Sequence, residues 1–472
     1  MPNHIGAFLL ASRCLAQIGV NITRVSYNKA VDSHTLFIEA EGTADQLDEA
    51  DRRLDEIGYL HRADPEGGIV LLEFKLRDVP GSVTAVLELI AEYNLNISYI
   101  SSQNNGTDHQ YFKMGLRTED NTAFEEFMER ARALCEVRVV DYNRSEKSFD
   151  NSIFYNSFVS SLIEDAGISR DCRDELLVNA NLAMQTLDEQ GLLPYRTFDT
   201  ISKFAKMLAC CRGEAFSPRI TAHKVTENTV ITVIEPPCGS NTIIIKSGAE
   251  YLFVDTGYAY YEEEMLHIIR QLVPEWDTLK KRVFLTHADV DHVGLLPLFD
   301  EIITSERSAQ SLRLGYDGCE DFREQNPLHK PYVRMCKALT GFKAPEPEKI
   351  NPMFPAAEFG SSVIRQVGYL DFGDLSFEVY EGKGGHLSGE LMLIDYDHRL
   401  AFTGDVYVNI KGMTSEQKQY NKYAPLLMNS VDTDKEDCAL ERRAIFDRLG
   451  VGKWRIFGAH GAVKDYDTAV DG

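Results

Sequence analysis

The sequence predicts a layered α/β domain in its C-terminal half, preceded by two small α+β units and a helical connector. After Pro218, short β-branched runs at 230–234, 242–245 and 251–254 alternate with helical stretches, which is the pattern of an α/β fold. Near the N-terminus, one order of strands and helices occurs twice. At 472 residues, the chain is long enough for two or three hydrophobic cores.

The second of the two small units shows its elements most clearly. Residues 70–76 read as a strand, and Pro80 and Gly81 then form a turn. An amphipathic helix follows over 82–93, and Asn94 and Asn96 end it. The remaining elements are a strand from 97 to 101, a strand at 111–116, a helix at 122–134 and a strand at 137–141. The whole is a βαββαβ unit.

The first unit repeats this order from the start of the chain. Residues 2–6 resemble the turn at 78–81, and residues 19–22 match 94–97, so the sequence contains an internal repeat. The first copy begins at the turn and lacks an opening strand. Either the true start lies upstream, or another strand fills that edge.

Both units resemble the ACT domain, a small module that often binds amino acids and regulates the enzyme that carries it. The expected repeats span residues 1–62 and 68–145. The resemblance implies an amino-acid effector, a homodimer or higher oligomer, and effector contacts at Asp78, Gly81 and Asn96. The alternative is that Asp78 and Asn96 only cap turns.

Residues 150–216 are expected to form a helical connector or cap. Phe154, Phe158 and Leu162 recur at helical spacing, and Pro194 and Gly213 mark breaks. No catalytic cluster occurs in this stretch. A second irregular stretch, residues 306–360, carries several Pro and Gly and is expected to be an insertion between core elements.

Composition narrows the function classes. The formal net charge of −24 repels phosphate backbones, so no nucleic acid is expected as a partner. Apolar residues make up 44% of the chain, but no apolar run is long enough to cross a membrane. The nine cysteines show no CxxC spacing, which favours reduced thiols. These features predict a cytoplasmic protein that acts on a small molecule, away from membranes.

The segment 284–294 is the most informative in the chain. An apolar strand delivers four potential metal ligands within six residues, and the segment is then expected to turn into a helix. Histidine nitrogens and carboxylate oxygens suit zinc, iron or manganese. The alternative is a polar loop that caps a helix, but the density of ligand-type residues favours metal. These four residues are His287, Asp289, Asp291 and His292.

This segment resembles the His-x-His-x-Asp-His-x-Gly motif of metallo-β-lactamase-fold proteins. The family places an Asp-Thr-Gly strand end before the motif, which here is Asp255 to Gly257. After it come a histidine beside glycine, an aspartate after a strand and a last histidine, and all appear here in that order over residues 219–472. They are His386, Asp405 and His460. The resemblance implies an αββα sandwich.

The resemblance also implies a ligand set for two divalent metal ions. His287, Asp289 and His386 would hold the first ion. The second ion would be held by Asp291, His292 and His460, and Asp405 would bridge the two. Asp291 and Asp405 would have the catalytic role of orienting a hydroxide. Asp255 would hydrogen-bond beside the ligand loop rather than bind metal, or it would serve only to hold the turn.

Asp289 departs from the family, which usually has a second histidine there. A carboxylate adds one negative charge and favours iron or manganese over zinc. A less positive site activates water less strongly and stabilises ferric iron better. Among relatives with an acidic residue at this place, flavodiiron and oxygen-binding di-iron proteins use Glu, and the nuclease-like domains of DNA-uptake channels use Asp.

Three functions remain open from the sequence. The first is a binuclear metal-dependent hydrolase of an ester, lactone, thioester or phosphodiester, regulated by an amino acid at the ACT-like units. The second is a non-haem di-iron protein that binds or reduces oxygen, related to flavodiiron proteins. The third is a ligand-sensing regulator without catalysis, which the intact ligand set disfavours.

Overall fold

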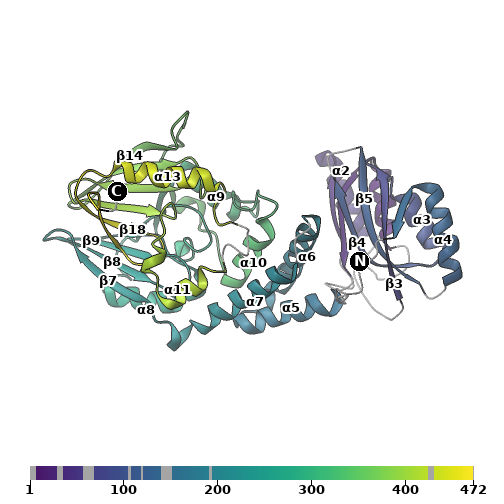
Figure 1. The fold of residues 1–472 in the computed structure, drawn as a ribbon, viewed down its shortest axis with the longest axis horizontal. Coiled ribbons are helices and arrows are strands. Elements are labelled where there is room, and N and C mark those ends of the chain that lie inside the picture. Colours follow the sequence, from purple (N-terminus) through teal and green to yellow (C-terminus); the bar gives the residue numbers. More distant parts are fainter. Residues whose placement is uncertain are drawn as a thin grey trace. The chain divides into compact units, whose positions relative to one another are not determined.

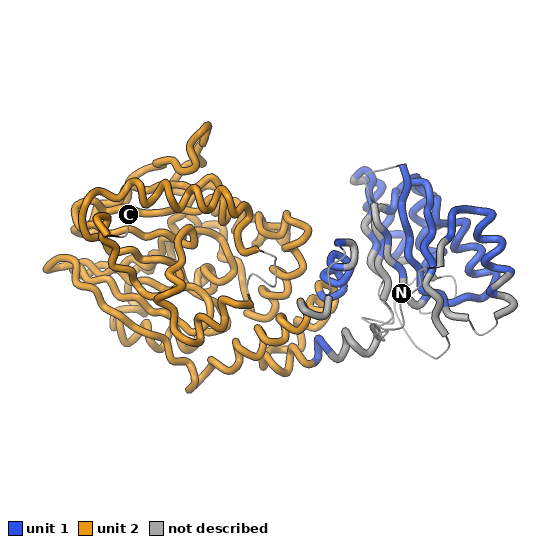
Figure 2. Tube along the Cα trace, viewed as in Figure 1, with its two compact units in different colours: residues 1–160, 180–192 blue, residues 161–179, 193–472 orange. Residues whose placement is uncertain are grey.

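The computed structural model describes residues 7–28, 36–56, 68–104, 108–118, 121–139, 151–190, 194–423 and 430–470. The chain divides into two compact units (Figure 2). Unit 1 comprises Met1–Ser160 and Ala180–Leu192, and unit 2 comprises Ser161–Asn179 and Leu193–Gly472. None of the described helices is both long and apolar enough to span a membrane.

Unit 1 contains one six-stranded sheet to which both repeats contribute (Figure 1). The strand order is β2-β1-β4-β5-β3-β6, and β1 pairs antiparallel with β4, so the first copy is joined to the second edge to edge. The expected turn at 2–6 lies outside the described residues. The elements are α1 (Ala7–Gln17), β1 (Asn21–Asn28), β2 (Leu36–Glu41), α2 (Ala44–Glu56), β3 (Gly68–Arg77), α3 (Thr84–Glu92), β4 (Asn96–Asn104), β5 (His109–Thr118), α4 (Asn121–Leu134) and β6 (Glu136–Val139).

The larger of the hydrophobic clusters described in unit 1 is shared by both copies. Phe8 of α1 belongs to the same buried cluster as Val86 of α3 and Phe127 of α4. Between α1 and α3, Ser12 lies 3.3 Å from the hydroxyl of Thr84. The helices of the two copies are therefore neighbours, as their strands are.

Three helices connect the N-terminal sheet to the C-terminal domain: α5 (Asn151–Ala166), α6 (Arg173–Glu189) and α7 (Pro194–Cys210). Within unit 2, Tyr261 donates a hydrogen bond to the carbonyl of Leu208 at 3.0 Å, which ties α7 to the C-terminal domain. The ring of Phe204 packs against those of Tyr258 and Tyr420. In unit 2, α7 is thus a packed part of the domain that carries the metal motif.

The rest of unit 2 contains two sheets that pack face to face (Figure 1). The first has the order β13-β12-β11-β10-β9-β8-β7. Its strands are β7 (Arg219–Lys224), β8 (Thr229–Glu235), β9 (Thr242–Ser247), β10 (Glu250–Val254), β11 (Arg282–Phe284), β12 (Glu301–Ser305) and β13 (Ile350–Phe354). The second runs β14-β15-β16-β17-β18-β19 and comprises β14 (Ile364–Phe372), β15 (Leu375–Gly382), β16 (Leu391–Asp395), β17 (Leu400–Gly404), β18 (Lys453–Gly458) and β19 (Lys464–Asp467).

The sandwich holds one core between the sheets and has a helix on each outer side. Phe284 from the first sheet and Phe377 and Phe402 from the second belong to the inner core. Ile445 of α13 (Lys435–Arg448) packs on the outer face of the second sheet, and α8 (Glu262–Leu272) buries Met265 and Ile269 beside the first. The other helices are α9 (Glu306–Tyr316), α10 (Lys330–Thr340) and α11 (Ser415–Tyr420). The expected αββα sandwich is confirmed.

Two local expectations were wrong. Residues 306–360 are not simply an insertion, because α9 and β13 belong to the sandwich and β13 pairs with β12. Pro352 disfavoured a strand assignment from the sequence, because proline is rare inside sheets. It is tolerated in β13 because this strand lies at the sheet edge. No helix follows His292 directly. Turns lead instead to a short 3₁₀ helix, Leu296–Leu298, which contains Pro297.

Candidate metal centre

The histidines and aspartates expected to hold metal converge at one end of the sandwich. His287 and Asp289 follow β11, His386 follows β15, Asp405 follows β17 and His460 follows β18. These strand ends meet because β10, β11 and β12 are parallel in one sheet, and β17 and β18 are parallel in the other. The seven expected ligands are therefore brought together.

The potential ligand atoms form three overlapping groups, each with its atoms within 4.8 Å of one another. Two of these groups are the ones that the sequence predicted for the two ions. The third contains His287, His292 and Asp405 and joins the other two. The three groups are His287, Asp289 and His386; Asp291, His292 and His460; and His287, His292 and Asp405.

Asp405 turns a different oxygen towards each of the predicted ion sites. Its Oδ2 lies 3.5 Å from Nε2 of His386, and its Oδ1 lies 3.3 Å from Nε2 of His460. A carboxylate placed in this way can hold two ions at once. This position is that of a bridging ligand.

The arrangement leaves buried polar atoms that metal ions would satisfy. Among the described residues, Nε2 of His287, Nε2 of His292 and Oδ1 of Asp405 are buried and have no hydrogen-bond partner. Buried polar atoms without a partner are costly, and native proteins rarely keep them unless a water or an ion binds there. All three atoms belong to the group that joins the two sites. The residues present therefore fit metal ions.

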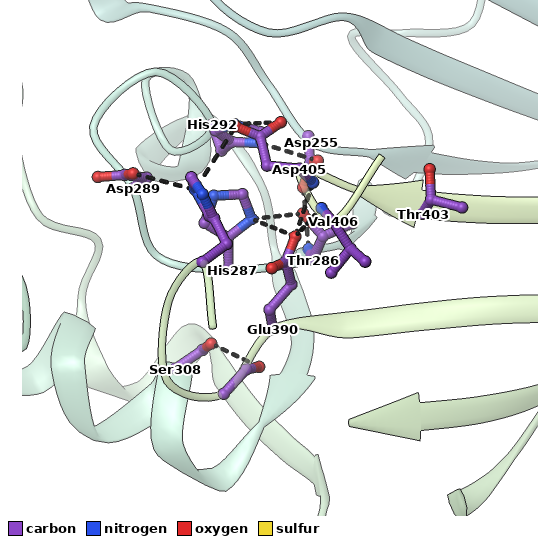
Figure 3. A network of polar contacts seen from close by, with 12 residues as sticks. Asp255, Thr286, His287, Asp289, His292, Ser308, Glu390, Thr403, Asp405 and Val406 are labelled. Carbon is purple, nitrogen blue, oxygen red and sulfur yellow. Dashed lines mark hydrogen bonds and ion pairs between the residues drawn. The ribbon is translucent and has the colours of Figure 1, made fainter. Parts of the chain in front are cut away.

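The hydrogen-bond network fixes which nitrogen of each buried histidine faces the centre (Figure 3). Oδ2 of Asp255 accepts from Nδ1 of His292 at 3.0 Å. The hydroxyl of Thr286 donates to Asp255, so its oxygen accepts from Nδ1 of His287. Both imidazoles therefore present an Nε2 lone pair to the centre. Asp255 therefore hydrogen-bonds to the segment that carries His287 and His292.

Two side chains that the sequence did not single out also support the ligands. Asp432 accepts from Nδ1 of His386 at 3.0 Å, which fixes that ring in the same way as Asp255 fixes His292. Glu390 accepts from the backbone N–H groups of Asp405 and Val406 and so holds the loop after β17 (Figure 3). Burial raises the pKa of Glu390 to about 8.

Arg323 is the third unforeseen residue, and it is a buried cation. Its guanidinium pairs with the carboxylate of Asp289 through Nε and Nη2, and its side chain is only 2% exposed. Burial raises the pKa of Asp289, but the charge of Arg323 outweighs it, and the pKa falls well below its usual value. This contact could not be predicted from the sequence, because Arg323 lies in an irregular stretch 34 residues from Asp289.

The candidate metal centre is closed around His287 and His292 and slightly open around Asp291, Asp405 and His460. The side chains of His287 and His292 are fully buried. Those of Asp291, Asp405 and His460 keep 12–14% of their surface exposed. A substrate would therefore approach past Asp291 and His460.

The three expected effector residues of unit 1 are not all brought together. Asp78 and Gly81 follow β3, next to the His109 end of β5. Asn96 pairs with Arg117 at the opposite end of β5. Strands rise about 3.4 Å per residue, so within one chain Asn96 lies the length of a strand away from Asp78.

The chain is similar to several solved structures. Among solved structures, the chain is similar to a metallo-beta-lactamase mutant from Cronobacter sakazakii (TM-score 0.31, 15% identity, 51% of this chain and 81% of that one). It is also similar to rubredoxin oxygen:oxidoreductase from Desulfovibrio gigas (TM-score 0.32, 15% identity, 52% of this chain and 57% of that one). A third similar structure is the chemotaxis sensor ODP in a peroxy di-iron form (TM-score 0.33, 12% identity, 52% of this chain and 89% of that one).

A search of curated protein sequences finds no match to this chain. A family model does match: the one described as metallo-beta-lactamase superfamily covers residues 236–418. This range contains the 287–292 motif, His386 and Asp405. Residues 236–418 of the chain are therefore similar to the metallo-beta-lactamase superfamily.

Proposed function

We propose that the chain is a metal-dependent hydrolase with two divalent ions, acting on a small ester, lactone, thioester or phosphodiester. The observation that carries this proposal is the set of three buried, unpartnered atoms on His287, His292 and Asp405. They face the gap between two groups of ligand atoms. A pair of ions in such a site would supply a hydroxide at neutral pH and polarise the substrate.

The chain's own residues would orient the reacting groups. Asp291 and Asp405 each have a carboxylate oxygen 3.3 Å from Nε2 of His460, so their carboxylates line the open side of the centre. From there they would hold the proton of the attacking hydroxide and fix its direction. Asp255 and Asp432 keep the imidazoles turned inward.

The charge of Arg323 favours hydrolysis over oxygen chemistry. Three carboxylates and a hydroxide would cancel the charge of two divalent ions. The buried guanidinium against Asp289 adds one positive charge, which restores the balance of a centre with histidine at that position. A more positive centre stabilises a developing oxyanion better and ferric iron less well.

A di-iron protein that binds or reduces oxygen is the second candidate. The observation in its favour is that Asp289 belongs to the same ligand group as His287 and His386, and carboxylate ligands suit iron and manganese. Tyr258 and Tyr420 form a buried phenol pair at 2.5 Å. Burial raises the pKa of both hydroxyls well above the usual value, and the charge of Asp291 adds to this. Such a pair could pass an electron or a proton.

One experiment separates the two candidates. The protein is purified without chelator, its metals are measured, and it is assayed with generic ester, lactone, thioester and phosphodiester substrates. Hydrolysis that disappears in His460→Ala supports the proposal. No turnover of any class, together with two irons per chain and an absorption spectrum that changes on exposure to oxygen, would replace it with the di-iron function.

We also propose that unit 1 senses an amino acid and so regulates unit 2. The support is its single sheet built from two similar copies, with α1 and α3 side by side. The turn at Asp78 and Gly81 lies beside α1, since a Cβ on Gly81 would lie 3.6 Å from the Cβ of Ala16. A thermal-shift screen of all twenty amino acids tests the idea, and no shift with any of them would refute it.

A further inference from the structure

Arg323 contacts two of the three side chains that would hold the first ion. Its Nη2 pairs with Oδ2 of Asp289 and lies 3.3 Å from Nε2 of His386. Its Nη1 donates to the carbonyl of Val431 at 2.7 Å. With its side chain 2% exposed, this guanidinium is part of the centre and not a surface group.

The segment that carries Arg323 is held firmly in place. Oδ1 of Asp321 accepts from the backbone N–H groups of Arg323 and Glu324, each at 2.9 Å. Lys337 of α10 donates to both Asp321 and Glu324, at 2.5 and 2.8 Å. These carboxylates and this ammonium are themselves largely buried. Arg323 is therefore anchored, and moving it away would break a buried network.

The contact with His386 matters because that ring has one free nitrogen. Nδ1 already donates to Asp432, so only the Nε2 lone pair is left for a metal ion. Nη2 of Arg323 therefore lies 3.3 Å from the one atom through which His386 can bind a metal ion. Even if the N–H group of Arg323 turned away from His386, its positive charge would stay close to the site and would strongly repel a divalent ion there, because the site is buried.

The second group of ligands lacks such a competitor. In the part of the chain that the structure describes, no lysine or arginine forms a hydrogen bond or ion pair with Asp291, His292 or His460. Their contacts are with one another, with Asp405 and with Asp255. The two groups therefore differ in charge although they share Asp405.

We propose that Arg323 makes the two metal sites unequal. The site of Asp291, His292 and His460 fills first, and the site of His287, Asp289 and His386 fills only at a higher metal concentration. This inference rests on the two-ion centre proposed above and adds a role for a residue outside the ligand set. Arg323 acts through Asp289 and His386 and is a positioning residue.

Metal titration tests the proposal without any substrate. Metal-free protein is dialysed against a series of Zn²⁺ or Mn²⁺ concentrations, and bound metal per chain is measured by elemental analysis. The wild-type protein should show two steps, with the second dissociation constant at least roughly tenfold above the first. In Arg323→Gln the second step should move towards the first by roughly tenfold or more. Arg323→Lys keeps the charge and should keep two separated steps.

Arg307→Gln is the matched control. Arg307 also pairs with a buried carboxylate, Glu381, and donates to a backbone carbonyl, that of Ala357, but it contacts none of the expected ligands. This variant should titrate like the wild-type protein, and a melting curve of each variant reports whether it is folded.

Each result of the titration decides something. Equal affinities of the wild-type protein for its first and second metal ion would overturn this inference and leave the two-ion centre intact. This result does not depend on whether the variants fold. An unchanged second step in folded Arg323→Gln would also overturn it. If the wild-type protein bound no metal at all, the proposed function would fall and this inference with it.

Discussion

Nδ1 of His292 lies 3.0 Å from Oδ2 of Asp255, and both side chains are buried. The same carboxylate accepts from the backbone N–H and the hydroxyl of Thr286. One aspartate therefore orients two successive parts of the ligand loop. Its backbone has a positive φ of 53°, a conformation that is uncommon outside glycine and is kept where the surroundings demand it.

Replacing Asp255 with Asn should weaken metal binding roughly 10- to 100-fold. An amide that keeps its oxygen on Thr286 presents its NH₂ to His292, which then accepts through Nδ1 and carries its proton on Nε2, where the metal ion would bind. Bound metal per chain, measured at limiting metal, checks this.

Asp395→Asn is the control for that variant. Asp395 is buried and accepts from Nδ1 of His398 at 3.1 Å, so it repeats the Asp–His contact away from the centre. It should leave metal affinity unchanged. Equal affinity in the wild-type protein and in Asp255→Asn would show that Asp255 only holds the turn.

Metal affinity should rise with pH. Burial lowers the pKa of His386, but Asp289 and Asp432 outweigh it and raise the pKa to about 10. Burial likewise lowers the pKa of His460, but Asp405 and Asp291 outweigh it and raise the pKa to about 9. Below these values the metal-free imidazoles hold protons, which an incoming ion must displace.

The size of the pH effect follows from linkage. For each proton released, apparent affinity should increase about tenfold per pH unit until the pH passes the raised pKa values. Calorimetric titration in buffers with different ionisation enthalpies counts the protons. Affinity that does not change between about pH 6 and 8 would mean that these imidazoles are already neutral.

Asp405→Asn should reduce metal capacity from two ions to one. The carboxylate offers one oxygen to each group, whereas an amide offers a single oxygen and a nitrogen that does not bind metal. Dialysis at saturating metal followed by elemental analysis measures the capacity. Asp374→Asn is the control, because Asp374 is an exposed carboxylate that accepts a hydrogen bond from Thr226, and this variant should keep both ions. An Asp405→Asn variant that also keeps both ions would show that Asp405 does not bridge them.

Gly385→Ala should destabilise the protein and lower its metal content. A Cβ on Gly385 would lie 2.2 Å from the backbone nitrogen of Cys438, so the loop before His386 would have to move away from α13. Overpacking of this kind costs about 1–3 kcal/mol. Thermal melting of the metal-free protein measures the loss.

Gly450→Ala is the control for this loop, because nothing lies within 4 Å of a Cβ there. It should melt like the wild-type protein. A Gly385→Ala variant as stable as the wild-type protein would show that the loop and α13 separate easily.

The sequence could locate the clustered histidines and aspartates because they follow a local rule. Four of them lie within six residues after one strand, so the position of that strand determines where all four lie: His287, Asp289, Asp291 and His292. His386, Asp405 and His460 were found through the order of the family's motifs. Parallel strands in each sheet then bring the strand ends together, which periodicity alone could not show.

The supporting residues could not be predicted because nothing near them in the sequence marks their role. Arg323 lies 34 residues from Asp289, and Asp432 lies 46 residues from His386. Neither belongs to a motif, and an arginine and an aspartate in polar stretches are ordinarily solvated. Their positions depend on how the segments around α9, α10 and α13 fold over the sandwich. Spacing in the sequence likewise did not reveal that Asn96 lies at the other end of β5 from Asp78 and Gly81.

Seven side chains from distant parts of the chain are proposed to hold two metal ions. The decisive measurement is bound metal per chain at saturation, compared between the wild-type protein and His292→Ala. We expect two ions in the wild-type protein and at most one in His292→Ala, because His292 belongs to two of the three ligand groups. A wild-type protein without metal, or a His292→Ala variant that keeps both ions, would contradict it.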